Sequence, residues 1–321
     1  MKTKILNILK NSADYISGES ISKQLGISRA GVWKNINKLK SEGYKIDSVT
    51  NKGYKIISAP KLLSADGIQA GLKTEFIGKN IHFYLETDST NTQAKLNSDS
   101  PDGSLFVTEC QKGGKGRLGR AWTSPSGIGI WFTLLLKPNL TPPQVPMITL
   151  IAGLAVCRSI CKLGLDARIK WPNDIVIGSK KVCGILTEMS AEMDRVNYVV
   201  CGIGINANTE SFSEELQVKA TSLMLEKGQK IDRCALLQDI LYEFEQCYTE
   251  FLKNGFSSFK SEYKKYCVTL NRTVSIIQNN QSTVAEAIDI TDDGELIVKI
   301  DGETKVVSSG EVSVRGLYGY I

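Results

Sequence analysis

The sequence GGKGRLGRAW, at residues 113–122, decides between two folds. It contains the spacing G-x-G-x-x-G at Gly114, Gly116 and Gly119, which also occurs in dinucleotide-binding folds. That fold needs a helix directly after the glycines, with an acidic residue about 20 positions further on. Here the sequence TSPSG at 123–127 and a strand-like segment follow instead, so we exclude the dinucleotide fold.

The same segment predicts a glycine-rich loop that carries Lys115, Arg117 and Arg120. Glycines let backbone N–H groups converge on an anion, and the cations neutralise its charge. The loop therefore favours a phosphate or carboxylate site, and the alternative is a mobile basic loop on the surface. The sequence contains no Walker A motif.

The segments on either side of the loop mix helix-like and strand-like patterns, which indicates an α+β domain with a mixed sheet over residues 61–268. Helices are predicted at 62–71, 90–97, 143–163 and 234–254, and strands at 81–86, 105–110, 129–136, 167–170, 175–177, 182–190 and 198–205. The tail, residues 269–321, reads as short alternating strands with turns at Asn279-Asn280 and Asp293-Gly294. It predicts a small β-barrel.

The first 60 residues are basic. They hold eleven Lys and Arg against four Asp and Glu, whereas the whole chain has a net charge of +5. Two helices, a third helix at 29–42 that Gly43 ends, and strands at 44–48 and 54–57 predict a winged helix-turn-helix domain over residues 1–60, with a linker at residues 58–60. Ser20 and Ser28 are the predicted caps of the second and third helices.

A winged helix binds either DNA or another protein. Donors on the third helix and on the wing favour DNA, because such side chains suit phosphates and base edges. The candidate DNA contacts are Ser28, Arg29, Lys34, Asn35, Lys38 and Lys52.

Composition narrows the chemistry and the location. The eight cysteines form no C-x-x-C pair and indicate reduced thiols in a cytoplasmic protein. The longest apolar run, residues 145–157, is too short to span a bilayer, so we expect a buried helix and no membrane partner. His82 is the only histidine and lies in a strand-like stretch, which excludes zinc sites with two histidines. We expect no metal held by the protein alone.

Three further motifs carry polar groups, and each has a structural alternative. KWPND at 170–174 places Lys170 at a strand end, where it is either a charge for a transferring group or a surface lysine. DSTN at 88–91 caps a helix or binds a neutral polar ligand. GIGIN at 202–206 has glycines that allow close backbone approach or tight packing.

Taken in order, these motifs resemble the bifunctional biotin–protein ligases, which are also biotin operon repressors. The resemblance covers nearly the whole chain, including the closing segment 310–315. It implies that the tail is an SH3-like barrel, and that the protein joins biotin to ATP and transfers biotin to a lysine of a biotin carboxyl carrier protein. It also implies Mg²⁺ with the nucleotide, biotin as corepressor precursor, operator DNA as a partner, and a homodimer.

The resemblance also assigns residue roles. Lys170 and Arg117 would be catalytic. The implied biotin contacts are Ser89, Thr90, Asn91, Gln111, Lys115, Gly116, Arg117 and Lys170. The implied ATP contacts are Arg120, Trp122, Asn173, Asn206 and Arg315.

The chain departs from the family at two loop positions. Lys115 stands where the family commonly has Arg, which removes a bidentate anion contact. Leu118 stands where a basic residue is frequent. The two departures leave open how tightly the adenylate is retained, and they do not affect the expected reaction. Two alternatives stay open: a biotin-sensing DNA-binding regulator with little ligase activity, and an acyl transferase similar to the lipoate ligases.

Overall fold

The computed structural model describes residues 1–41, 44–50, 52–58, 62–278, 281–309, 313–316 and 320. The chain divides into two compact units, Met1–Leu62 and Leu63–Ile321. Four predicted features lie wholly or partly outside the described residues: the helix stop at Gly43, the linker at 58–60, the turn at 279–280 and the segment 310–315.

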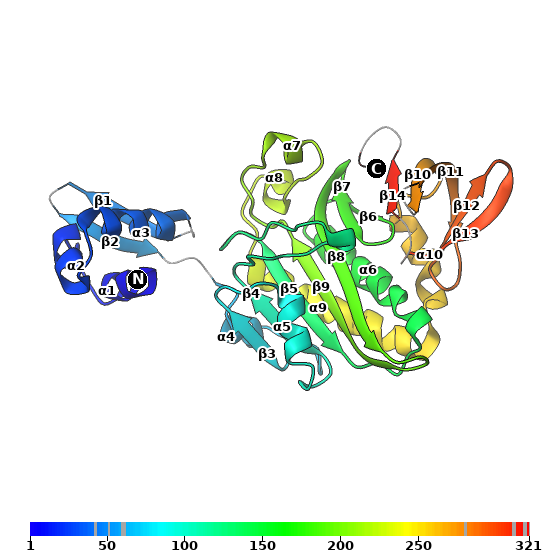
Figure 1. Cartoon of the computed structure of the whole chain (residues 1–321), viewed down its shortest axis with the longest axis horizontal. Helices are drawn as coiled ribbons and strands as arrows, with labels where there is room; N and C mark the ends of the chain where they lie inside the picture. Colours follow the sequence, from blue (N-terminus) through cyan, green and yellow to red (C-terminus); the bar gives the residue numbers. More distant parts are fainter. Residues whose placement is uncertain are drawn as a thin grey trace. The chain divides into compact units, whose positions relative to one another are not determined.

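The smaller unit has the predicted order of a winged helix-turn-helix. Its elements are α1 (Lys2–Lys10), α2 (Gly18–Leu25), α3 (Arg29–Ser41), β1 (Lys45–Val49) and β2 (Gly53–Ser58). The two strands pair antiparallel as the wing (Figure 1). A separate core, which includes Ile5, Ile21, Val32 and Ile36, is fully or almost fully buried between the helices. This unit therefore has its own hydrophobic core.

One of the two predicted helix caps is wrong. Ser28 caps α3, because its Oγ accepts a hydrogen bond from the Gly31 N–H at 3.1 Å. Ser20 does not cap α2; the cap is Ser17, whose Oγ accepts from the Ser20 N–H at 3.0 Å. A cap bonds the N–H three residues further on, so two serines at this spacing give the same local pattern.

The larger unit is built on a mixed sheet of seven strands in the order β3-β4-β5-β9-β8-β7-β6. Only the β3–β4 pair is parallel. The strands are β3 (Ile81–Tyr84), β4 (Ser104–Thr108), β5 (Ile130–Leu136), β6 (Ala167–Lys170), β7 (Asp174–Ile177), β8 (Lys180–Ala191) and β9 (Val196–Ile205). This agrees with the predicted mixed-sheet α+β class.

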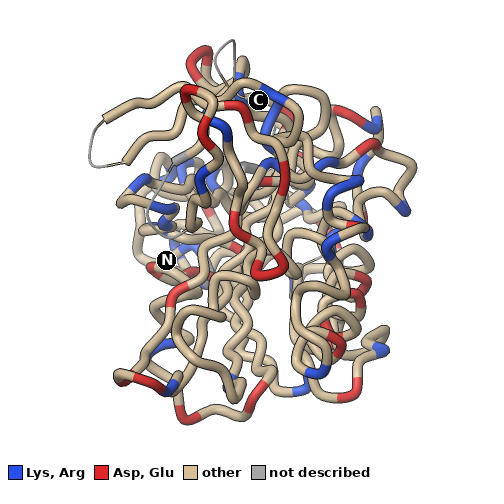
Figure 2. The backbone as a smooth tube through the Cα atoms, turned by 90° about the vertical axis from the view of Figure 1, so that its right-hand side faces the viewer, with Lys and Arg blue, Asp and Glu red and all other residues tan. Residues whose placement is uncertain are grey.

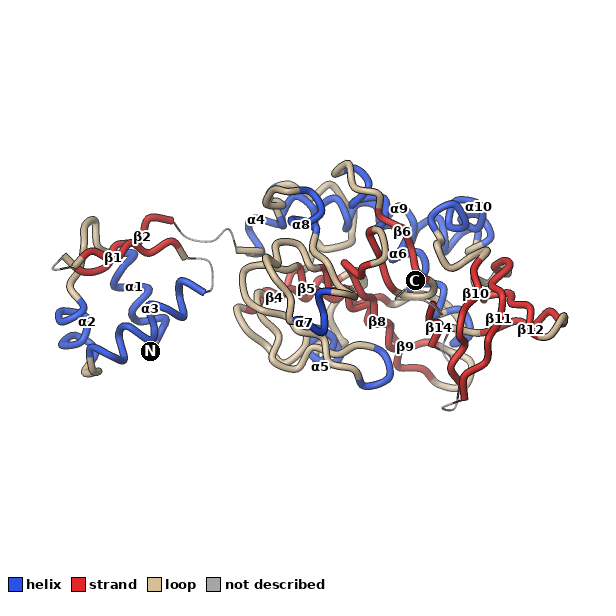
Figure 3. The backbone as a smooth tube through the Cα atoms, turned by 90° about the horizontal axis from the view of Figure 1, so that it is seen from above, coloured by secondary structure: helices blue, strands red, loops and turns tan. Residues whose placement is uncertain are grey.

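Helices cover both faces of this sheet, and α5 lies on the opposite face from α6 and α9 (Figure 3). The helices are α4 (Ala65–Ala70), α5 (Thr90–Leu96), α6 (Pro146–Lys162), α7 (Glu214–Gln217), α8 (Leu223–Lys227), α9 (Arg233–Asn254) and α10 (Ser257–Tyr266), with short 3₁₀ turns η1 (Arg117–Gly119) and η2 (Pro142–Gln144). The sequence analysis missed α10, because only Phe259 and Tyr263 mark its buried face.

The segment Pro142–Lys162, which contains η2 and α6, is long and apolar enough to cross a membrane, yet 72% of its apolar window is buried inside the protein. The predicted buried helix is therefore a core helix of this unit. Its side chains share one hydrophobic core with the sheet and with α9.

The C-terminal strands form an antiparallel sheet in the order β13-β12-β11-β10-β14. They are β10 (Arg272–Gln278), β11 (Gln281–Ile290), β12 (Leu296–Ile300), β13 (Glu303–Val307) and β14 (Ser313–Gly316). Buried residues such as Val274 and Val298 belong to the same core as the large sheet. Acidic and basic residues are mixed over this part of the surface (Figure 2). Closure into an SH3-like barrel, and a domain boundary at 268/269, stay predictions.

A buried ion pair joins distant parts of the larger unit. Glu109 is 0% exposed and Arg233, in the first turn of α9, is 5% exposed. Two guanidinium N–H groups of Arg233 donate to the two Glu109 carboxylate oxygens, at 3.0 and 3.2 Å. The same carboxylate accepts from the backbone N–H of Leu63 at 2.6 Å and of Gly127 at 3.1 Å. Glu109 thus connects the start of the unit, the end of β4 and α9.

We predict that Arg233→Ala lowers the free energy of unfolding by about 3–5 kcal/mol, because it leaves the Glu109 charge buried without its partner. Lys264→Ala is the control. It removes an exposed ion pair with Asp289, with Nζ–Oδ1 at 2.7 Å, and should change stability by less than about 1 kcal/mol. Urea unfolding measures the free energy of unfolding of both variants. Equal decreases would contradict the larger contribution that we assign to the buried pair.

Candidate functional site

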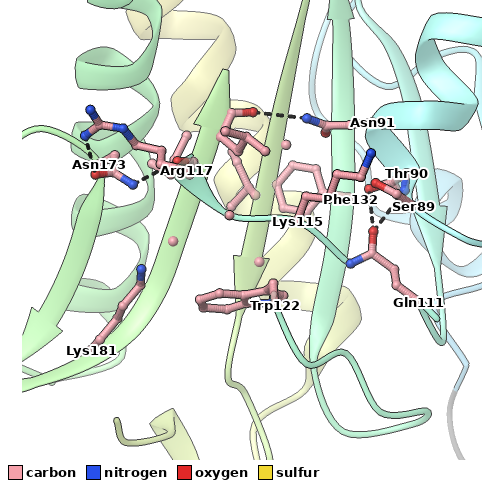
Figure 4. Close-up of a pocket in the computed structure, with 17 residues that line it drawn as sticks. Ser89, Thr90, Asn91, Gln111, Lys115, Arg117, Trp122, Phe132, Asn173 and Lys181 are labelled. Atoms are coloured by element: carbon pink, nitrogen blue, oxygen red, sulfur yellow. Dashed lines mark hydrogen bonds between the residues drawn. The ribbon is translucent and has the colours of Figure 1, made fainter. Parts of the chain in front are cut away.

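A pocket of about 50 Å³ lies between the α5 face of the sheet and the glycine-rich loop (Figure 4). Ser89, Thr90 and Gln111 line one end, and Arg117, Asn173 and Lys181 line the other. The remaining lining residues are Asn91, Lys115, Gly116, Trp122, Phe132, Gly184, Ile185, Leu186, Gly202, Ile203 and Gly204. The pocket is therefore polar at both ends, with an apolar wall between them.

Glycines on two neighbouring strands make room for this pocket. A Cβ on Gly202 would lie 2.1 Å from Asn91 Oδ1, and a Cβ on Gly204 would lie 2.5 Å from Trp122 Nε1. Gly184 on β8 pairs with Gly204 on β9, and its Cβ would lie 3.0 Å from the Trp122 ring. Tight packing, one of the two alternatives for the GIGIN motif, is what the structure shows, because the Asn91 and Trp122 side chains occupy the space beside the glycines.

The end of the pocket at α5 is a network of polar groups. Gln111 caps α5, because its Oε1 accepts from the Thr90 N–H at 2.9 Å, while its Nε2 donates to Ser124 Oγ at 2.7 Å. Asn91 Nδ2 donates to Glu188 Oε2 at 2.8 Å, and its Oδ1 accepts from Thr133 Oγ1 at 2.6 Å. These bonds fix the orientation of both amides.

Ser89 occupies the N-cap position of α5, but its side chain makes no capping hydrogen bond. The residue is only 4% exposed and lines the pocket. Its hydroxyl is thus directed at the space beside the amides rather than used to cap the helix. The DSTN motif therefore supplies polar groups for a ligand as well as the start of α5.

The glycine-rich loop is folded back on itself. Gly116 N–H donates to the Arg120 carbonyl at 2.7 Å, and Trp122 N–H donates to the Gly114 carbonyl at 2.8 Å. The half-buried Arg117 guanidinium donates to Asn173 Oδ1 at 3.2 Å and also to the Ser309 carbonyl. Burial lowers the pKa of Arg117. Through Arg117 the loop is therefore bonded to the β6–β7 turn and to the segment after β13.

Lys170 ends β6 and is only 7% exposed. Its Nζ lies 3.7 Å from the centroid of the Tyr320 ring, a cation–π contact. Burial lowers its pKa to about 8, although the nearby Asp174 carboxylate opposes the shift. Asp174 in turn pairs with Lys181, Nζ to Oδ1 at 2.5 Å, and accepts from the Tyr320 hydroxyl. Lys170 is not a surface lysine.

The structure brings most of the predicted ligand contacts to one pocket and leaves four outside its lining. Lys170 lies next to the pocket, in the cation–π contact with Tyr320. Arg120 and Arg315 are exposed, but they are close enough to Lys170 to lower its pKa. Asn206 is 8% exposed, and its Nδ2 donates to the Thr221 carbonyl at 3.1 Å. Its amide therefore holds the segment before α8.

Sequence reasoning missed the apolar wall and two polar neighbours of the pocket. Phe132, Ile185 and Ile203 lie on buried strands. In such strands a residue that lines a pocket has the same sequence pattern as a residue of the core. Lys181 follows a tight turn and belongs to none of the motifs. Tyr320 is far in sequence from all of them. The Trp122 indole Nε1 is buried against Gly204 and has no hydrogen-bond partner among the described residues.

The candidate DNA contacts divide into two groups. Arg29, Lys34, Lys38 and Lys52 are exposed. Ser28 caps α3, and Asn35 Nδ2 donates to the Gly31 carbonyl at 2.7 Å, so both also serve the helix itself.

Comparison with known proteins gives consistent matches over the whole chain. Residues 84–206 match the biotin/lipoate A/B protein ligase family, residues 2–55 match the HTH domain, and residues 269–315 match the biotin protein ligase C terminal domain. The bifunctional ligase/repressor BirA of Bacillus subtilis (strain 168) is 39% identical, with 94% of each chain covered. The chain belongs to the biotin/lipoate A/B protein ligase family.

Less similar proteins also match most of this chain. The bifunctional ligase/repressor BirA of Escherichia coli (strain K12) is 29% identical over 97% of this chain and 96% of its own. Among solved structures, the biotin protein ligase from Aquifex aeolicus in complex with biotin and ATP is 28% identical, with a TM-score of 0.66, over 74% of this chain and 99% of that one. The resemblance stated from the motifs is thus confirmed at the level of the family.

We predict that Gly202→Ala displaces Asn91 and lowers the free energy of unfolding by about 1–3 kcal/mol, because buried hydrogen-bonding groups lose their partners. Gly153→Ala in α6 is the control, since its Cβ would meet no atom closer than 3.8 Å. Urea unfolding of the two variants compares them. A Gly202→Ala variant as stable as Gly153→Ala would show that the close approach imposes no constraint.

Proposed function

We infer that this chain is an ATP-dependent biotin–protein ligase and a biotin-responsive transcriptional repressor. It forms biotinyl-5′-AMP and then transfers biotin to a lysine of a biotin carboxyl carrier protein. The observation that carries the ligase activity is a pocket with Ser89, Thr90 and Gln111 at one end, Arg117 and Lys181 at the other, and an apolar wall between them. Biotin has a neutral polar ring system at one end and a carboxylate at the other, joined by an apolar chain. The family and the relatives named ligase/repressor support the same assignment.

Biotin would lie along the pocket. Ser89, Thr90, Asn91 and Gln111 would contact its polar rings, and the apolar wall would contact its chain. Its carboxylate would then point to the cationic end, where Lys115, Gly116, Arg117 and Lys170 would surround the reacting groups.

In the first step a biotin carboxylate oxygen attacks the α-phosphorus of ATP. The new bond is the acyl–phosphate bond, and the bond to pyrophosphate breaks. Lys170 and Arg117 would stabilise the negative charge that develops on the phosphate oxygens. In the second step the carrier lysine amine attacks the acyl carbon, AMP leaves, and one proton is released. Neither step needs a histidine.

The nucleotide would be placed by Arg120, Trp122, Asn173, Asn206 and Arg315. Mg²⁺ would enter with ATP, since it is usually held by phosphates and a few protein oxygens. No cluster of three or more potential metal-binding side chains occurs among the described residues. Asp174 is the one acidic side chain beside Lys170 and Lys181 that could contact the ion.

We also propose the partners and the location. The carrier is a domain of a biotin-dependent carboxylase, and the winged helix binds operator DNA as a homodimer, because a single winged helix contacts only a half-site. The protein acts in the cytoplasm.

The direct test is incubation with ATP and labelled biotin together with a purified carrier domain, with lipoate in a parallel reaction. Incorporation of biotin that requires ATP supports the proposal. Labelling with lipoate alone would assign the chain to the lipoate-like alternative, and no labelling would leave it a regulator.

We predict that Lys170→Ala slows adenylate formation by about 10²-fold, because a charge that stabilises the transition state is lost, while biotin binding weakens less. Pyrophosphate release measures the first effect and calorimetry the second. Near-normal turnover would remove Lys170 from the catalytic set.

The same lysine predicts a pH profile. With a pKa of about 8, Lys170 in the free enzyme loses its proton as the pH rises through that value. We therefore expect kcat/KM for adenylate formation to fall above pH 8. Lys170→Arg, which keeps its charge, should have a lower rate without this fall. An identical alkaline limb in both proteins would assign the titration to another group.

Deletion of residues 1–60 should abolish operator binding and leave most ligase activity, because the two units have separate cores. Operator affinity of the full chain should fall steeply with salt, and Lys34→Ala should lower the slope of log K against log salt by about 1. Fluorescence anisotropy with an operator duplex selected from random sequence measures both. A slope near zero would favour the protein-docking alternative for the winged helix.

A further inference from the structure

A second cavity, of about 240 Å³, lies on the opposite face of the large sheet from the ligase pocket. It is bordered by the C-terminal end of α6, the end of α8 and the first turns of α9. Leu163, Ile231, Ala235 and Leu236 supply most of its wall. No step of the proposed ligase reaction uses this cavity.

Three lysines surround the cavity, and they differ in their partners. Lys162 is neutralised, because its Nζ lies 2.9 Å from Asp239 Oδ1 and 2.7 Å from Glu243 Oε1. Lys227 and Lys230 also line the cavity, and no carboxylate among the described residues lies within ion-pair distance of either. The cavity therefore has two ammonium groups that form no ion pair with the described residues.

The Asp232 carboxylate also lines the cavity, so two lysines and one carboxylate face each other there. Asp232 is the N-cap of α9, and its Oδ1 accepts from the N–H groups of Cys234 at 3.1 Å and Ala235 at 3.2 Å. This leaves Lys227 and Lys230 as the polar groups at the cavity mouth that are available to an anion.

A buried hydroxyl also lines the cavity. Ser159 is 1% exposed, and its Oγ has no hydrogen-bond partner among the described residues. A buried hydroxyl without a partner lowers stability unless a ligand or water satisfies it. Ser159 borders the cavity, but its Oγ is closed off from it and does not contribute to anion binding.

We propose that this cavity binds a small organic anion, a monocarboxylate with a short apolar chain. Its chain packs against Leu163, Ile231 and Leu236, and its carboxylate pairs with Lys227 and Lys230. The apolar wall selects for the chain, and the two ammonium groups select for the charge. This site is independent of the ligase pocket and does not rest on the proposed function.

Isothermal titration of the full-length protein with hexanoate tests the proposal, with hexanol and acetate as probes that lack the charge or the chain. Hexanoate should bind saturably, and each of the other two should bind about tenfold more weakly or not at all. Equal binding of hexanol or of acetate, or no saturable heat with millimolar hexanoate, would overturn the proposal.

Variants locate the binding. The double substitution Lys227→Ala/Lys230→Ala should weaken hexanoate binding by about five- to tenfold, the effect expected for two partly exposed ion pairs. Lys253→Ala, an exposed lysine at the other end of α9, should have no effect. Ala235→Phe should abolish binding by filling the cavity from an exposed position on the helix.

Biotin transfer to the carrier domain serves as the folding control and should be unchanged in all of these variants. Hexanoate binding that survives both Ala235→Phe and the double substitution would place the anion elsewhere and refute the site. Loss of biotin transfer in the unaltered protein would instead refute the ligase function and leave this site untouched.

Discussion

The ligase pocket depends on three positions where the central strands carry no side chain. Side chains normally cover a sheet face at every second residue. Gly202 and Gly204 are two residues apart on β9, and Gly184 is paired beside Gly204 on β8, so the bare positions are contiguous. Asn91 and Trp122 fill part of the resulting space, at distances that a Cβ would not permit. The other features of the site are arranged around this exposed backbone.

The glycine-rich loop completes the site as a cover. Its glycines lose much backbone entropy when they are ordered. Arg117 opposes this loss by bonding to Asn173 and to the Ser309 carbonyl, two segments far away in the sequence. One side chain of the loop thus contacts both the β6–β7 turn and the segment after β13.

Electrostatics is organised differently in the two units. The winged helix keeps its cations exposed on α3 and the wing, where salt screens them. The larger unit buries its charges in pairs, as in Glu109–Arg233, or leaves them partly desolvated, as in Lys170. An exposed charge suits long-range attraction to a polyanion, whereas a desolvated charge acts more strongly on a bound reacting group. The two proposed activities thus use cations in different environments.

The sequence by itself determined the winged helix, the mixed α+β class, the buried α6 and most of the pocket residues. These depend on local periodicity, glycine and proline positions, and short motifs. Only the tertiary structure decided that Ser17 and not Ser20 caps α2, that Asn206 holds the α8 segment, and that Lys181 and Tyr320 lie beside Lys170. It also decided that a second cavity lies on the face of the large sheet opposite the ligase pocket. The Ser17 cap stayed ambiguous because two serines three residues apart give the same local pattern. The other contacts join separate segments of the chain, and local sequence pattern carries no information on which side chain from another segment will occupy a given space.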